Sequence, residues 1–207
     1  VHARGNSTVT VDPAAVPTFS NGTNQIAFFA YGPNARINVL GNNPFDVTTQ
    51  NSTLFRVEQG ADFNGNALSL TASGAGSTAV IGSGAGTEVS SDAAVINVSG
   101  SGANGITVEG GATGIIDAAT TMNLTGSNAI GAIVDGQKHD IFGRNSGSPV
   151  TSTRLNSAAS LNASQSGLTG YLARNRAQLT NSGDITFSGA NATGIRVRDY
   201  PLTLDKY

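Results

Sequence analysis

The side chains best suited to chemistry in this 207-residue sequence lie in one short stretch. Asp135 and Asp140 flank Lys138 and His139, and Arg144 follows. Two carboxylates beside basic groups could serve as the acid and base of polysaccharide cleavage, which needs paired carboxylates on one face. One prediction from these residues is therefore a carbohydrate-active β-helix enzyme, a lyase or hydrolase, whose groove is lined by the two acids, His139 and Arg144. It is the alternative to the prediction that the repeat supports below.

The sequence does not indicate other catalytic or cofactor-binding arrangements. His2 and His139 are its two histidines, and the Gly-Ser-Gly triplets at 82–84 and 100–102 have the character of turns rather than of a nucleophile elbow. The Gly-rich segment 74–86 lacks the Lys of a phosphate-binding loop. Without Cys, neither a disulfide framework nor a thiolate metal site can form. We therefore expect no catalytic residue, metal or cofactor.

Basic side chains are concentrated toward the C-terminal end. Residues 1–130 carry three Arg and eight acids, whereas residues 131–207 carry eight Lys or Arg and five acids. The total net charge of −2 lacks the basic surplus of a nucleic-acid-binding protein. The basic residues would bind an anionic glycan or another acidic surface, or form a solvated face. The candidate partner-binding residues are Lys138, His139, Arg144, Arg154, Arg174, Arg176, Arg196 and Arg198.

A sequence repeat must position these residues. Five segments share an apolar residue, a spacer, a small or apolar residue, and Ser or Thr, usually followed by Gly. They begin at Leu70, Ile96, Met122, Leu161 and Ile185, at intervals of 26, 26, 39 and 24 residues. A second motif, Gly followed by alternating apolar residues, comes eight to ten residues after the start of the first. A fixed period in this range is typical of a solenoid.

The pattern inside each repeat predicts strands. Apolar residues alternate, as in Ile106 and Val108, which is the period of a strand with one buried face. Because no repeat could bury its apolar face alone, we predict stacked coils: a right-handed parallel β-helix, with three strands in each coil of about 24–27 residues. Candidates for the third strand lie around Val89, Ile115–Ile116 and Leu179.

Two parts of the chain depart from the repeat. The first 60 or so residues, up to Phe63, contain six of the eight Phe and four of the six Pro, so we predict an N-terminal cap with irregular first coils over 1–60. Residues 61–207 are predicted to be regular coils of one continuous solenoid, and Pro201–Leu204 still resembles a strand. The long interval contains an insertion at 135–160, which would be a surface loop, either one that binds a partner or one tolerated without a partner.

Asparagine recurs at one position of the repeat, at Asn97, Asn123 and Asn162. These residues would either be solvent-facing spacers or stack as a ladder of amides hydrogen-bonded along the axis of the rod. The ladder is a structural prediction and involves no chemistry.

Two segments resemble a known family. Residues 179–197, LTNSGDITFSGANATGIRV, and 108–115, VEGGATGI, resemble repeats in the passenger domains of bacterial autotransporters, the group of pertactin-like and AIDA-like adhesins. The resemblance covers roughly residues 55–200. It implies type V secretion from a Gram-negative bacterium, display at the outer membrane or release, and a translocator β-barrel in the parent chain.

The same resemblance implies a function. Such a passenger would be an adhesin that attaches to a host surface protein or glycan, or to another passenger, in virulence, aggregation and biofilm formation. The absence of Cys is consistent with threading an extended chain through a barrel. A passive stalk is a further alternative to the enzyme.

Overall fold

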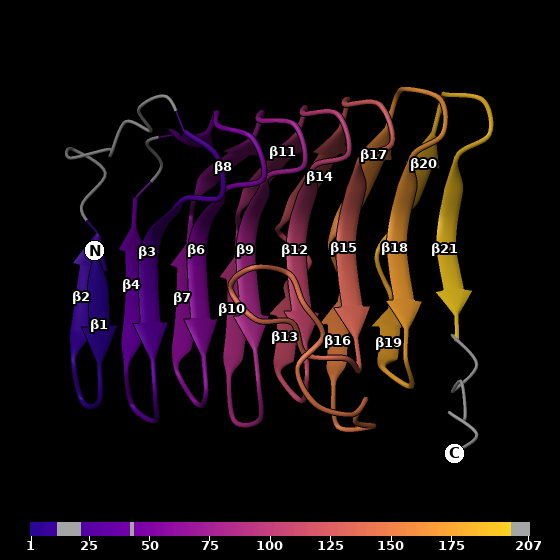
Figure 1. The fold of residues 1–207 in the computed structure, drawn as a ribbon. Helices are drawn as coiled ribbons and strands as arrows, with labels where there is room; N and C mark the ends of the chain where they lie inside the picture. Colours follow the sequence, from indigo (N-terminus) through magenta and orange to yellow (C-terminus); the bar gives the residue numbers. More distant parts are fainter. Residues whose placement is uncertain (12–21, 42–43, 200–207) are drawn as a thin grey trace, which may run out of the picture.

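A computed structural model describes residues 1–11, 22–41 and 44–199 as an all-β chain wound into a right-handed parallel solenoid of about seven turns. The chain passes repeatedly through three parallel sheets, A, B and C, so that corresponding strands of successive turns pair with each other. Figure 1 shows the strands side by side along the rod, with β1 and β21 at opposite ends. The predicted parallel β-helix with three strands per coil is confirmed. The described residues form no helix, and hence none long and apolar enough to cross a membrane.

Sheet A has eight strands and runs the whole length of the rod. Its strands are β1 (His2–Arg4), β3 (Ile26–Tyr31), β6 (Thr53–Glu58), β9 (Thr78–Ser83), β12 (Asn104–Glu109), β15 (Ile130–Asp135), β18 (Thr169–Arg174) and β21 (Thr193–Arg198). The second sequence motif forms the later strands of this sheet.

Sheets B and C complete each turn. Sheet B contains β2 (Thr8–Val11), β4 (Arg36–Leu40), β7 (Asp62–Asn66), β10 (Glu88–Asp92), β13 (Thr113–Ile116), β16 (Arg154–Ser157) and β19 (Gln178–Asn181). Sheet C contains β5 (Pro44–Val47), β8 (Ser69–Ala72), β11 (Val95–Val98), β14 (Thr121–Leu124), β17 (Ser160–Ala163) and β20 (Ile185–Phe187). The first motif forms sheet C from β8 onward, and the predicted third strands are β10, β13 and β19 of sheet B.

The core is a stack of apolar side chains inside the three sheets. Ile96 pairs in register with Leu70 on one side and with Met122 on the other, and all three side chains are completely buried. Each turn thus covers the apolar residues of the turns above and below it. Burial of this kind contributes roughly 25 cal/mol per Å² of apolar surface, so the turns stabilise one another rather than folding singly.

The phenylalanines near the N-terminus fill the core of ordinary turns. Phe55 stacks on Phe28 with ring centroids 5.0 Å apart, and it also contacts Phe45 at 5.8 Å and Phe63 at 5.0 Å. Because β1 to β6 belong to the same three sheets as the later strands, the predicted N-terminal cap is not confirmed. Parts of the cap prediction, at 12–21 and 42–43, and the predicted strand at Pro201–Leu204, lie outside the described residues.

Glycines at one corner of the solenoid allow the turns to approach closely. A Cβ atom at Gly100 would overlap the carbonyl oxygen of Gly74 in the preceding turn, and one at Gly126 would overlap that of Gly100. The backbone N–H of Gly100 donates a hydrogen bond to the carbonyl oxygen of Ala72 at 2.9 Å. The Gly of the first motif is therefore required by contact between backbones at the corner.

The insertion interrupts the solenoid between β15 and β16. Because Arg154–Ser157 already form β16, the segment outside the three sheets is 136–153, shorter than the predicted loop of 135–160. The residue pairing of the sheets continues across it, with Thr113 of β13 opposite Arg154 of β16. The insertion thus leaves the rod undisturbed and is free to fold on its surface.

Candidate functional site

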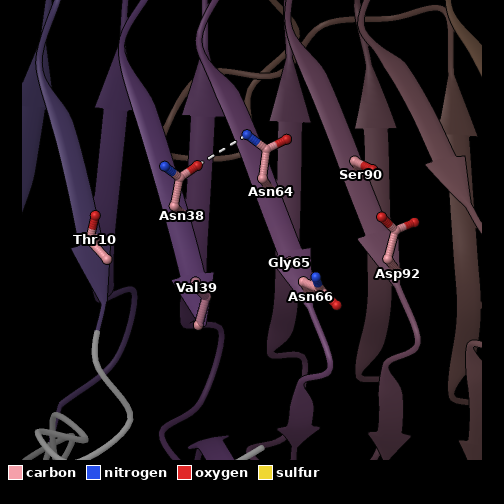
Figure 2. Close-up of a pocket in the computed structure, with 8 residues that line it drawn as sticks. All are labelled: Thr10, Asn38, Val39, Asn64, Gly65, Asn66, Ser90 and Asp92. Atoms are coloured by element: carbon pink, nitrogen blue, oxygen red, sulfur yellow. Dashed lines mark hydrogen bonds between the residues drawn. The ribbon is translucent and has the colours of Figure 1, made fainter. Parts of the chain in front are cut away.

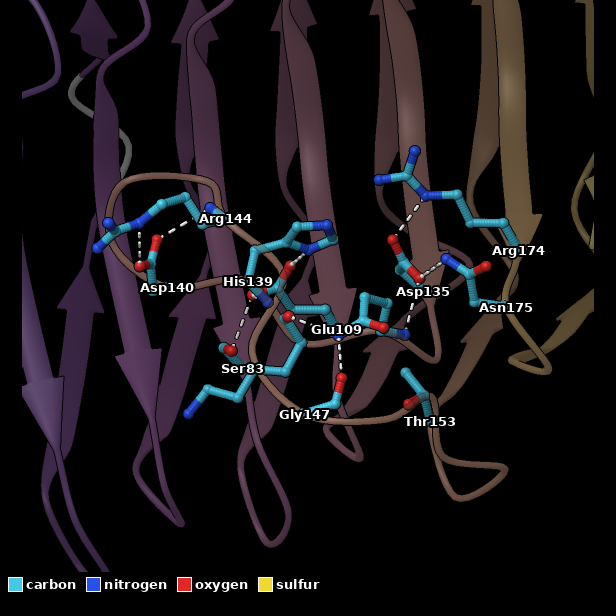
Figure 3. A network of polar contacts seen from close by, with 12 residues as sticks. Ser83, Glu109, Asp135, His139, Asp140, Arg144, Gly147, Thr153, Arg174 and Asn175 are labelled. Atoms are coloured by element: carbon cyan, nitrogen blue, oxygen red, sulfur yellow. Dashed lines mark hydrogen bonds and ion pairs between the residues drawn. The ribbon is translucent and has the colours of Figure 1, made fainter. Parts of the chain in front are cut away.

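The insertion 136–153, called the strap below, folds back over the outer face of sheet A. It leaves β15 and runs toward the N-terminal end of the rod, where His139 reaches β12 and β6 (Figures 1 and 3). The backbone carbonyl oxygen of His139 accepts a hydrogen bond of 3.0 Å from the Arg56 guanidinium, which lies 83 residues earlier in the chain. The strap therefore crosses several turns that are distant in the sequence.

One row of side chains along the outer face of sheet A explains why the strap lies there. Most of the side chains in this row are charged, and they are paired in register from strand to strand. The row consists of Arg4, Tyr31, Glu58, Ser83, Glu109, Asp135, Arg174 and Arg198. Tyr31 is 44% exposed, but Glu58, Glu109 and Asp135 are only 6%, 4% and 0% exposed. The buried part of the row is the part near the strap.

Glu109 is the centre of the contacts between strap and sheet. Its Oε1 accepts hydrogen bonds from the Ser83 hydroxyl at 2.8 Å and from the backbone N–H of His139 at 3.1 Å. Its Oε2 lies 2.8 Å from Nδ1 of His139, and Arg56 Nη2 lies 3.8 Å from Oε1. A buried carboxylate is tolerated only when its oxygens are bonded in this way, so Glu109 fixes the position of His139.

His139 is the titratable group of this contact. The hydrogen bond to Glu109 raises the pKa of His139 above its ordinary value of 6.5, and burial opposes this effect. The negative charges of Glu109 and Asp135 also raise the pKa, while the positive charge of Arg174 lowers it. The imidazolium form therefore strengthens the attachment of the strap.

Two more cations complete the network on the side of β6. Arg56, which is 5% exposed, pairs through Nε with Oε1 of Glu58 at 2.5 Å. Lys138 of the strap lies 4.0 Å from the other carboxylate oxygen of Glu58. The buried positive and negative charges under the strap therefore lie next to one another, as burial of charge requires.

Asp135 fixes the start of the strap. Its Oδ2 pairs with Arg174 Nε at 2.6 Å, and its Oδ1 accepts hydrogen bonds from Asn175 Nδ2 at 2.7 Å and from the backbone N–H of Gln137 at 2.8 Å (Figure 3). Gln137 in turn donates to the carbonyl oxygen of Gly147 at 2.7 Å, which ties the two sides of the strap together. The Asp135 side chain is thus committed to structural contacts.

The tip of the strap is a tight turn with exposed apolar side chains. Asp140 accepts hydrogen bonds from the backbone N–H groups of Arg144 and Phe142 and pairs with Arg144 Nε at 2.8 Å, and these contacts lower the pKa of Asp140. The Arg144 guanidinium lies 5.1 Å from the centre of the Phe142 ring. Phe142 is 73% exposed and Ile141 is 50% exposed. Aromatic side chains and Arg are the types most often found among the residues that dominate binding interfaces.

The predicted groove of the enzyme alternative does not form in the described part of the chain. His139 and Asp140 line a cleft beside the strap, but Asp135 is completely buried against Arg174 and does not reach it. The reason is that Asp135 ends strand β15, whereas Asp140 lies at the far end of the strap. In the described residues, no group of three or more His, Asp or Glu side chains is arranged to hold a metal ion.

The basic candidates fall in four places. Lys138, His139 and Arg144 belong to the strap. Arg174, Arg196 and Arg198 lie on the outer face of sheet A, where Arg198 is in register with Arg174, and Arg176 lies in the turn after β18. Arg154 lies on sheet B, opposite Thr113 and Gln178, and is separate from the others. The structure therefore places the three strap residues and Arg174, Arg196 and Arg198 over or on the outer face of sheet A.

Asparagines form ladders on the other two sheets. On sheet C, Asn123 Nδ2 donates to Asn97 Oδ1 at 3.1 Å, and Asn162 Nδ2 donates to Asn123 Oδ1 at 3.2 Å. Sheet B has a pair that the sequence analysis missed, with Asn64 Nδ2 donating to Asn38 Oδ1 at 3.1 Å (Figure 2). The amides bond along the rod, as in cross-β stacks.

The sheet residues that receive the strap were not predicted from the sequence. They are Arg56, Glu58, Ser83 and Glu109. A signal was present, because Glu58, Glu109 and Asp135 each occupy the last position of their sheet A strand. Acids at an equivalent position in three turns indicate a row on one face. The partner of that row was not evident, because it is a loop far away in the sequence.

Comparison of the chain with protein-family models, with curated proteins and with solved structures finds no match. The fold and the geometry of the strap therefore carry the functional argument alone.

Proposed function

We propose that this chain is an adhesin passenger of the autotransporter type, displayed on or released from the surface of a Gram-negative cell. It would attach the cell to a host surface protein or glycan, or to a passenger on a neighbouring cell. The observation that carries the proposal is the strap, which buried charges hold on a rigid sheet while its tip exposes Ile141 and Phe142. Binding loops are typically supported by rigid scaffolds in this manner.

The faces of the rod support the same function. Sheets B and C present hydroxyls and amides in straight rows, among them the ladder of Asn97, Asn123 and Asn162. Many weak polar contacts along such rows would add up between two parallel rods, because each turn repeats the same groups. This mechanism needs no deep pocket.

The arginines near the C-terminal end of sheet A add positive charge beyond the start of the strap. Arg176, Arg196 and Arg198 are exposed, whereas Arg174 is paired with Asp135. An exposed cationic group of this kind attracts acidic surfaces and accelerates encounter with them. We therefore assign these three residues to electrostatic attraction and the strap tip to specific contact.

Display of the passenger on bacterial cells tests the proposal. The variant Ile141→Ser/Phe142→Ser removes the apolar tip but keeps Asp135, Glu109 and His139 in place. We expect it to weaken cell aggregation or host attachment severalfold, whereas the control Tyr31→Ser, on β3 of sheet A and 44% exposed, leaves attachment unchanged. The amount of displayed protein is measured by antibody for each variant.

Three results would contradict the proposal. If wild-type cells neither aggregate nor attach to host cells, the passive stalk is favoured. If purified protein instead releases reducing ends or unsaturated sugars from polysaccharides, the enzyme alternative is favoured. If recharging the ladders of sheets B and C and deleting the tip both leave adhesion intact, the proposed surfaces are wrong.

A further inference from the structure

A cleft of about 320 Å³ lies beside the tip of the strap, on the outer face of sheet A. From the sheet it is lined by Thr53, Arg56, Thr78 and Ile81. From the strap it is lined by the segment 139–143, which includes the exposed Phe142 ring. The cleft exists because the strap crosses the sheet here, so it is absent from a plain solenoid turn.

The third side of the cleft is a series of turns that precede the sheet A strands. Equivalent positions in these turns are occupied by Asn24, Asn51 and Gly76. Their backbones are left-handed, with φ of 59°, 51° and 65°, respectively. A Cβ atom at Gly76 would overlap the Asn51 Oδ1 atom, so the glycine leaves room for that amide. The Asn51 side chain is exposed and lines the cleft, and its amide has no hydrogen-bond partner among the described residues.

The charges that line the cleft are already matched. Arg56 pairs with Glu58 and Glu109, and His139 also pairs with Glu109. At the tip, Asp140 pairs with an arginine of the same turn. The cleft therefore offers no uncompensated charge to an ionic ligand, and its available groups are neutral donors, neutral acceptors and an aromatic face.

We propose that this cleft binds a neutral saccharide unit. The apolar C–H face of a sugar ring would pack on Phe142, and the ring hydroxyls would bond to the Asn51 amide and the hydroxyls of Thr53 and Thr78. Pockets that combine apolar surface with a few fixed polar groups are typical of small-molecule sites. This inference rests on the proposed adhesin function and names the class of its ligand.

A saccharide panel tests the assignment with purified protein. Immobilised lactose, N,N′-diacetylchitobiose and mannobiose are the neutral probes, and digalacturonate and sialyllactose are the acidic ones. We expect saturable binding of at least one neutral probe, weakened about tenfold by Phe142→Ala or by Asn51→Gly, a loss of roughly 1.4 kcal/mol. Because glycine accepts the left-handed φ of Asn51, that variant removes only the amide.

A matched control is available at a later turn. Asn128 holds the same position before β15 with φ 55° but does not line the cleft, so Asn128→Gly should leave binding unchanged. Phe142→Tyr should retain binding, because it keeps the aromatic face. Thermal unfolding of every variant shows whether the fold is preserved.

The outcomes separate this inference from the proposed function. If no neutral probe binds, if only acidic probes bind, or if Asn128→Gly weakens binding as much as Asn51→Gly, the cleft assignment is wrong. If cells adhere through the strap tip and no neutral saccharide inhibits that adhesion, the adhesin function is supported and the saccharide assignment is wrong. If the purified protein binds a neutral saccharide but cells that display it do not adhere, the cleft assignment is supported and the adhesin function is wrong.

Discussion

At the scale of single residues, the unusual feature is a set of charges buried on the outside of a β-sheet. Glu58, Glu109 and Asp135 would be solvated on an uncovered solenoid, but the strap removes them from water. Desolvation of a carboxylate costs several kcal/mol unless hydrogen bonds and opposite charges replace the water. Arg56, His139 and Arg174 supply these hydrogen bonds and opposite charges. Loss of one of these partners should therefore lower the free energy of unfolding.

Replacing Glu109 with Gln tests this dependence. Gln keeps the size of the side chain but removes the charge that faces His139 and Arg56. We expect a loss of about 2 kcal/mol in the free energy of unfolding, the range for buried hydrogen bonds to charged groups. Urea denaturation measures the loss, and Glu88→Gln, on the exposed face of sheet B, is the control with an expected change under about 0.5 kcal/mol. Equal effects of the two substitutions would contradict the importance of the network.

The raised pKa of His139 predicts how stability depends on pH. A folded-state pKa above the unfolded value means that the His139–Glu109 contribution is fully present below about pH 6.5. It is lost as pH rises through the folded-state pKa, because neither state then binds the proton. The difference in stability between the wild type and His139→Gln should therefore shrink as pH rises from about 6 to 8.5. Thermal unfolding of both proteins across this range measures it, and a constant or growing difference is the contradictory result.

At the scale of elements, close stacking of turns explains why the repeat is built from so few residue types. The strands position Ile, Val and Leu inward, while corners such as Gly74, Gly100 and Gly126 allow backbones to touch. Amide ladders add hydrogen bonds between turns outside the core. The elements are therefore fixed by contacts along the axis of the rod, and changes at the corners should propagate to neighbouring turns.

Gly100→Ala should destabilise the protein. The new methyl group would meet the carbonyl oxygen of Gly74, which cannot move without separating two turns. We expect a loss of about 1–3 kcal/mol by overpacking. Gly194→Ala is the control, since a Cβ there would lie at an ordinary contact distance of 3.4 Å from Phe187. Equilibrium unfolding compares the two, and a loss no greater for Gly100→Ala than for Gly194→Ala would show that the corner is not tight.

The asparagine ladder makes a graded prediction. Asn123 takes part in two ladder hydrogen bonds and Asn97 in one. Asn123→Ala should therefore lower the free energy of unfolding about twice as much as Asn97→Ala, at roughly 0.5–1 kcal/mol per bond. Urea denaturation of the two variants and of the double variant checks this, and equal losses would indicate that the amides bond mainly to water.

At the scale of the whole molecule, local sequence predicts the solenoid but not the path of the strap. Ile96 and Met122 could be placed on adjoining turns because their motifs recur every 26 residues, and the register of a repeat follows from its period. The cap prediction was not confirmed, for a related reason. Phe28, Phe45 and Phe55 differ in size from the later core residues but occupy the same inward positions.

The strap could not be placed by the same reasoning. The insertion was evident as an interval of 39 residues, but its contacts with Arg56 and Glu109 join segments 83 and 30 residues apart. No periodicity links a loop to a sheet face. What selects the position is the charge pattern on the outside of sheet A, which emerges only when the turns are stacked in register.

The position of the strap is the claim most open to direct measurement. The chain lacks Cys, so Phe142→Cys provides one site for a nitroxide spin label at an exposed position. Paramagnetic relaxation should broaden the amide signals of β6 and β9 near Arg56 and Ile81, far earlier in the chain, and should spare β20 on sheet C. Broadening confined to the strap and to β15 and β16 would contradict a strap held across sheet A.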